Sequence, residues 1–132
     1  MPLTNDGRDF IAGAITGKDT TLFDNANTRI GVGDSDIDFD ASHSDLQGSN
    51  THRESVDSGY PERDPEGDGS DNNLKYQATF GGDDANFTWE EWGLFNSGSG
   101  GTMLNRLVEY NGTKEPGQTW IFEVEIEVQI GS

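Results

Sequence analysis

The sequence predicts a β-rich α+β domain: an antiparallel β-sandwich or Greek key with one N-terminal helix and about six to eight strands. Apolar and polar residues alternate along residues 74–80 and 119–130, the pattern of strands that face water on one side. Gly accounts for 18 of the 132 residues, so turns are frequent. A helical apolar stripe marks one segment near the N-terminus.

The N-terminal segment predicts a helix that begins after Thr4 or Asn5, both good N-cap residues, and runs to about Thr16. Gly17 is a natural stop. Its apolar residues form one narrow stripe of Phe10, Ile11, Ala14 and Ile15. We expect this helix to lie on a sheet.

After a short predicted strand at residues 28–32, carboxylates stand at every second position from Asp34 to Asp40, and the first three of them are Asp34, Asp36 and Asp38. They are candidate ligands for Ca²⁺, although Phe39 occupies the position where an EF-hand needs Gly. A solvated acidic face is the favoured interpretation. Ile37 and Phe39 are expected to point inward, and residues 40–46 to form a short helix.

Residues 51–60 predict a strand, and residues 61–73 a long exposed loop. This loop holds a second set of calcium candidates, Asp64, Glu66 and Asp68, but Lys75 stands where a calcium loop needs Glu. A solvated loop is favoured, and it is also the preferred place for a partner contact.

The two histidines, His43 and His52, match no zinc-binding spacing, and the chain has no Cys to complete a site. We expect surface or packing histidines. Histidines from several copies could still meet on the axis of a symmetric oligomer.

The densest apolar block spans residues 85–97. Its alternation changes phase at Trp92, next to Gly93, which predicts a β-bulge. Residues 98–101 are a glycine-rich turn, and residues 102–110 return as the second strand of a hairpin.

Asn111-Gly112 predicts a further turn, and residues 119–130 predict the last strand. Because this strand is long, it is expected to be central or to span two sheets. The predicted core consists of Phe87, Trp89, Trp92, Leu94, Phe95, Trp120, Phe122, Val124 and Ile126.

The formal net charge is −17, from 8 Lys and Arg against 25 Asp and Glu. This argues against direct nucleic-acid binding, which needs clustered cations. It favours a halophilic, possibly haloarchaeal, origin, where salt screens self-repulsion. No apolar run is long enough to insert in a membrane, no secretory signal is visible, and the length fits a single domain.

The block Trp-Glu-Glu-Trp-Gly-Leu-Phe-Asn at residues 89–96, a glycine-rich turn, and Met-Leu-Asn-Arg at 103–106 resemble small virion proteins of tailed phages, in particular the tail-collar fibre type of domain. Residues 3–12 resemble the opening helix of that family, and residues 28–35 its first strand and glycine turn.

The resemblance implies a virion structural role in the tail or on the capsid surface, after assembly in the host cytoplasm. The implied protein is a tail-tip, baseplate or fibre-anchoring subunit that works as a homotrimer or larger ring with other virion proteins. No fibre shaft follows this domain in the sequence. That favours a connector, or a capsid decoration or turret protein, over a receptor-binding fibre.

An enzyme is not expected, because neither histidine has a recognisable catalytic partner and adjacent Glu90 and Glu91 should face opposite sides of a strand. No cofactor is expected apart from the possible Ca²⁺. A small carbohydrate-binding module for host attachment is the remaining alternative, provided that Trp side chains are exposed.

Overall fold

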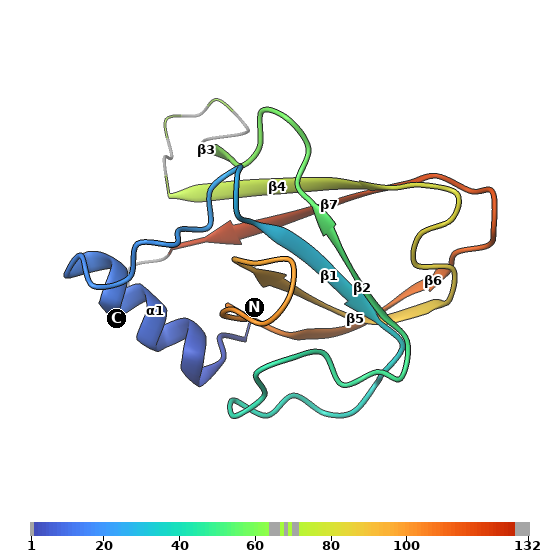
Figure 1. Ribbon diagram of the computed structural model, residues 1–132, viewed down its shortest axis with the longest axis horizontal. Helices are drawn as coiled ribbons and strands as arrows, with labels where there is room; N and C mark the ends of the chain where they lie inside the picture. Colours follow the sequence, from blue (N-terminus) through green and yellow to red (C-terminus); the bar gives the residue numbers. More distant parts are fainter. Residues whose placement is uncertain (1, 64–66, 68, 70–71, 129–132) are drawn as a thin grey trace.

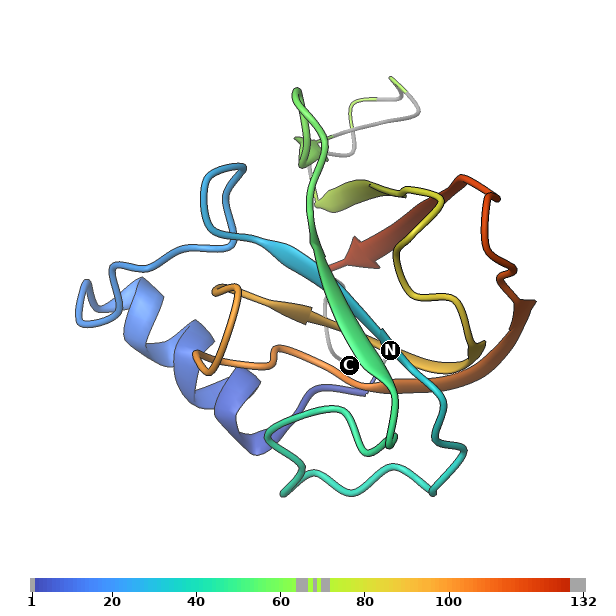
Figure 2. The same ribbon diagram turned by 45° about the vertical axis from the view of Figure 1, so that its right-hand side comes forward.

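A computed structural model describes residues 2–63, 67, 69 and 72–128 of the chain. These residues contain one helix and seven strands. The strands form two antiparallel sheets, with strand orders β2-β1-β5-β6 and β3-β4-β7. β4 and β7 cross over one face of the larger sheet, and α1 lies at one end of the molecule (Figures 1 and 2). The predicted β-rich α+β sandwich is confirmed.

The elements are α1 (Asn5–Ile15), β1 (Arg29–Gly33), β2 (Thr51–Ser55), β3 (Glu62–Arg63), β4 (Asn73–Phe80), β5 (Thr88–Phe95), β6 (Leu107–Thr113) and β7 (Trp120–Glu127).

Helix α1 begins and ends close to where the sequence predicts. The Thr4 hydroxyl accepts a hydrogen bond from the Gly7 amide at 2.8 Å and donates one to the Met103 carbonyl at 2.5 Å. The N-cap therefore also anchors the helix to the chain that follows β5.

The predicted apolar stripe of α1 is only partly packed. Phe10 stacks edge-on against Phe23 with ring centroids 4.9 Å apart, but Ile11 is 40% and Ile15 81% exposed. Gly7 is the buried residue of the helix, and it approaches the Leu104 backbone so closely that a Cβ would lie 2.1 Å from the carbonyl oxygen. Close backbone approach, and not the stripe, holds α1 in place.

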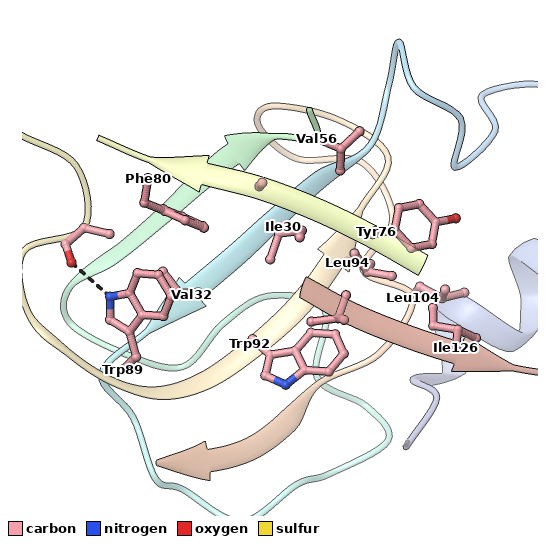
Figure 3. Close-up of a cluster of buried hydrophobic side chains, with 13 residues drawn as sticks. Ile30, Val32, Val56, Tyr76, Phe80, Trp89, Trp92, Leu94, Leu104 and Ile126 are labelled. Carbon is pink, nitrogen blue, oxygen red and sulfur yellow. Dashed lines mark hydrogen bonds between the residues drawn. The ribbon is translucent and has the colours of Figure 1, made fainter. Parts of the chain in front are cut away.

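The main core fills the space between the two sheets (Figure 3). Trp89 is fully buried at its centre, with rings of Phe80, Trp120 and Phe122 edge-on at 4.7 to 5.5 Å. Its indole N–H donates to the Ala85 carbonyl at 2.9 Å. Of the predicted core, Trp89, Trp92, Leu94, Phe95, Val124 and Ile126 are buried, and Phe87, Trp120 and Phe122 are half-buried against it.

Strand β5 changes phase, as the sequence predicts, but earlier than at the predicted position beside Gly93, because its register with β6 shifts between Trp89 and Glu91. Trp89 and Trp92 both belong to the main core. Phe95 instead joins a second, smaller cluster with Leu46 and Met103. The shift therefore places Trp89 on the same face as Trp92, and ordinary alternation places Phe95 on the opposite face.

The hairpin of β5 and β6 is confirmed, but the predicted turn at Asn111-Gly112 is wrong. Both residues lie inside β6, where Gly112 pairs with Trp89 and has a φ of +101°. A Cβ on Gly112 would lie 3.4 Å from the Trp120 ring. Gly112 thus permits an irregular strand conformation beside a large ring, and it does not reverse the direction of the chain.

Strand β7 alternates as predicted, with Val124 and Ile126 buried and Glu123, Glu125 and Glu127 exposed. Its expected placement, central or across two sheets, is wrong, because within the described residues β7 pairs with β4 alone and is an edge of the smaller sheet. Charged side chains protect an edge strand from pairing with other chains, which accounts for a long strand at this position.

Three local predictions also differ from the structure. The strand predicted over residues 51–60 ends at Ser55, and β3 lies inside the segment predicted as loop. Residues 40–46 are not helical, because the Asp40 carboxylate accepts hydrogen bonds from the amide and hydroxyl of Ser42 and closes a turn instead. Ile37, expected to point inward, is 55% exposed.

Candidate functional site

The motif that carries the family resemblance contains a fully buried ion pair. Arg106 Nε lies 2.7 Å from Glu91 Oε1, and neither side chain exposes any surface. Glu91 belongs to β5, and Arg106 directly precedes β6. The hairpin therefore brings the two halves of the motif together.

Each member of this pair also binds the loop of residues 34–50. The Glu91 carboxylate accepts hydrogen bonds from the amides of Gly48 at 2.8 Å, Gln47 at 2.9 Å and Ser35 at 3.3 Å. Arg106 donates to the carbonyls of Ile37 at 2.9 Å and Ser35 at 3.4 Å. The pair thus fastens both ends of the acidic loop to the sheet.

Glycines make room for the Glu91 carboxylate. A Cβ on Gly33 would lie 2.3 Å from its Oε2, and one on Gly48 would lie 3.0 Å from the same atom. Sequence reasoning treated Glu91 only as half of a Glu pair and missed this role. The available signal was a carboxylate inside the densest apolar block, followed by one of the few arginines.

A second arginine fixes the glycine-rich turn after β5. The Arg53 guanidinium lies 3.6 Å from the Phe95 ring centroid, a cation–π contact. It donates to the carbonyls of Ser97 and Gly100, both at 2.9 Å. The turn of the motif is thereby held against β2.

The first set of calcium candidates does not gather around one point. The Asp34 carboxylate accepts hydrogen bonds from the Asn50 amide at 3.0 Å and the Asn50 side chain at 2.8 Å, while Asp36 and Asp38 are exposed. Burial raises the pKa of Asp34. The hydrogen bonds from Asn50, together with those from the Asp34 and Ser49 backbone, lower the pKa by more than burial raises it, so the pKa lies below the ordinary value for Asp. The second set, Asp64, Glu66 and Asp68, lies outside the described residues.

Among the residues that the structure describes, one set of three metal-ligating side chains converges: His52, Glu54 and Asp84. None of these was a predicted calcium ligand. The other histidine, His43, accepts a hydrogen bond from the Asp40 amide and lies 6.3 Å from the Phe39 ring.

An apolar groove is lined by residues of α1, β4 and the end of β7. This α1 groove is lined mainly by Leu3, Phe10, Ile11, Phe23, Ile126 and Val128, with Glu125 and Glu127 at its rim. Val128 is 65% exposed. The Tyr76 hydroxyl donates to the Phe23 carbonyl at 2.9 Å and closes its floor.

The tryptophans limit where a sugar could stack. Trp89 and Trp92 are buried, so a platform built on either ring is excluded. Trp120 is half-buried and lines a shallow depression together with Asn111 and Ile121. A stacking role is therefore open to Trp120.

Comparisons of the chain with models of protein families, with curated proteins and with solved structures gave no match. Over the described residues, no helix combines the length and apolar character needed to cross a bilayer.

Proposed function

We propose that the chain is a non-enzymatic structural subunit of a tailed virus: a tail-tip, baseplate or fibre-anchoring component that works as a homotrimer or larger ring. The motif resemblance supplies the viral context. The structural observation that carries an assembly role is the α1 groove together with the exposed stripe of α1.

The exposed apolar side chains of α1 share one face. Ile11 and Ile15 are one helical turn apart, and Ile11 also lines the α1 groove. Contiguous exposed apolar surface in a soluble protein is characteristic of an interaction site. Full burial of one such side chain contributes about 1.5 to 3 kcal/mol. A neighbouring copy that covers Ile15 and Val128 would recover this free energy.

The net charge decides when such contacts form. Copies that each carry −17 repel one another in dilute salt, whereas the Debye length falls to about 3 Å at 1 M salt. A halophilic host would therefore provide the conditions in which the apolar contact outweighs the repulsion.

The same surface would also serve a capsid decoration or turret protein, with the neighbouring capsid protein as its partner. A carbohydrate-binding module for host attachment is the second candidate. It rests on one observation, the half-buried Trp120 beside Asn111 in a surface depression.

The test is light scattering of the purified chain in multimolar KCl, with and without Ca²⁺. We expect a defined trimer or larger ring for the wild type. Ile15→Glu should shift the mass toward the monomer, because it places a charge in the apolar contact. Ile121→Glu is the matched control, since Ile121 is 63% exposed on the outer face of β7, away from α1.

A wild type that stays monomeric at high salt would overturn the assembly proposal. It would favour the carbohydrate-binding module, with the Trp120 depression as the binding site. If Ile121→Glu dissociates the oligomer and Ile15→Glu does not, the interface lies on β7 and the assignment to α1 is wrong.

A further inference from the structure

We infer that His52, Glu54 and Asp84 form a binding site for one divalent transition-metal ion. This site is separate from the α1 groove and independent of the proposed assembly role. It would tie the edge strand β2 to the turn that joins β4 to β5.

The geometry brings three different ligand groups to one point. His52 and Glu54 are two residues apart on β2, so their side chains share a face of the strand. His52 Nε2 lies 3.0 Å from Glu54 Oε1. Asp84 reaches the same point from the β4–β5 turn, and the three ligand atoms all lie within 4.8 Å of one another.

These separations need little adjustment to hold an ion. Ligand atoms bound about 2.1 Å from a tetrahedral zinc ion lie about 3.4 Å from one another. The His52–Glu54 distance is already close to that value, and the Asp84 ligand atom lies within 4.8 Å of both. The side chains of His52 and Glu54 are 33% and 26% exposed, which leaves a path for an ion to enter.

The turn that presents Asp84 is held from within the molecule. Lys114 is 1% exposed, and its ammonium donates to the Gly81 carbonyl at 2.6 Å and to Asn86 Oδ1 at 2.8 Å. The Asn86 side chain donates to the Gly82 carbonyl at 2.9 Å. Trp89 holds the same turn through its bond to the Ala85 carbonyl (Figure 3). A ligand placed on such a rigid support costs little entropy to bind.

The charges at this point are not balanced by protein cations. In the part of the chain that the structure describes, the Asp84 carboxylate has neither a hydrogen-bond donor nor an ion-pair partner. Two carboxylates therefore face one imidazole in a half-buried position. A divalent cation would neutralise both carboxylates at once.

The ligand types select the class of ion. Imidazole nitrogen with two carboxylates suits zinc and its first-row neighbours. Ca²⁺ instead takes six to eight oxygen ligands and Mg²⁺ near-ideal octahedral oxygen sites. The site thus differs in kind from the calcium sites that the sequence predicts in the acidic segments.

The consequence for the molecule is a cross-link between non-adjacent segments. Among the strands that the structure describes, β2 pairs with β1 alone, and the β4–β5 turn connects the two sheets. An ion that binds only the folded arrangement stabilises it. Zinc should therefore raise the melting temperature of the wild-type chain.

The test is isothermal titration of the full chain with Zn²⁺, at low and at high ionic strength, with native mass spectrometry for stoichiometry. We expect one zinc ion per chain. His52→Gln and Asp84→Asn should each weaken binding by at least about tenfold. Asp84→Asn is the cleaner variant, because it keeps the shape of the side chain.

Two variants control for non-specific attraction of cations to an acidic protein. His43→Gln removes the other histidine, and Asp36→Asn makes the same charge change as Asp84→Asn on an exposed side chain. Both should bind zinc as the wild type does. Circular dichroism and thermal melts without metal establish that every variant is folded.

The inference is overturned if folded wild-type chain takes up no zinc. Equal losses for Asp36→Asn and Asp84→Asn, or a complete loss of binding at high ionic strength, would also overturn it, because either result would show diffuse electrostatic attraction in place of a chelate. Displacement of zinc by a modest excess of Ca²⁺ would contradict the choice of metal class.

Discussion

At the scale of single residues, Glu91 and Arg106 organise more of the molecule than any other pair described above. Their side chains are wholly buried and satisfy five backbone groups of one long loop between them. A buried ion pair does not by itself add stability, since desolvation opposes the attraction. Its effect here is to specify where the loop lies.

Removal of either charge should be costly. Glu91→Gln keeps the shape of the side chain but leaves Arg106 as a buried cation without a counterion. Arg106→Met conversely leaves the Glu91 carboxylate as a buried anion without a counterion. We expect each to lower the free energy of unfolding by about 3 to 5 kcal/mol. Urea unfolding at constant salt measures this.

The double variant Glu91→Gln with Arg106→Met should lose less than the sum of the two single losses, because no uncompensated charge remains. Additive losses would mean that the two side chains act independently. Lys75→Met is the control, since it breaks the exposed pair of Lys75 with Glu123 and should change stability little.

At the scale of elements, α1 shows that a helix can be docked by its backbone. Thr4 bonds to Met103, and Gly7 packs on the Leu104 carbonyl, while the apolar stripe stays half-exposed. The two glycines inside the helix therefore have different roles, although both lower its intrinsic propensity.

Gly7→Ala and Gly13→Ala should act in opposite directions. A Cβ at position 7 meets backbone, and overpacking of this kind destabilises by about 1 to 3 kcal/mol. The three atoms nearest to a Cβ at position 13 all belong to the Asp19 side chain, whose carboxylate can rotate away, so the gain in helix propensity of about 0.5 to 1 kcal/mol should remain. Thermal unfolding of the two variants tests this. Equal destabilisation would mean that the Asp19 side chain is fixed and that the contrast between the sites is wrong.

At the scale of the whole molecule, the net charge of −17 is the dominant property. The exposed glutamates of β7 form one acidic face. Several of the few cations are already bound within the chain: the side chains of Arg53, Arg106 and Lys114 donate to backbone carbonyls, and Lys75 pairs with a carboxylate. Self-repulsion among the exposed carboxylates therefore opposes the compact state in dilute salt.

The melting temperature should rise substantially between low and multimolar KCl, because screening removes this repulsion. Sucrose is the control, since it strengthens burial without screening charge. A melting temperature that responds to sucrose but is indifferent to KCl would refute the halophilic interpretation.

Local patterns predicted the elements whose signals are local. The alternation of β4 and β7, the phase change in β5 and the Thr4 cap were all confirmed, since each depends on backbone geometry that neighbouring residues dictate. The strand order and the edge position of β7 were not predicted, because pairing partners far apart in sequence decide them.

The sequence by itself determined a β-rich domain with one short helix, an aromatic core and a strongly acidic surface, because composition and periodicity control burial. The tertiary structure alone decided that Glu91 and Arg106 pair, that His52, Glu54 and Asp84 converge, and that Ile15 and Val128 stay exposed. The physical reason is that such contacts depend on the register and crossing of separate segments of the chain, which no local pattern encodes.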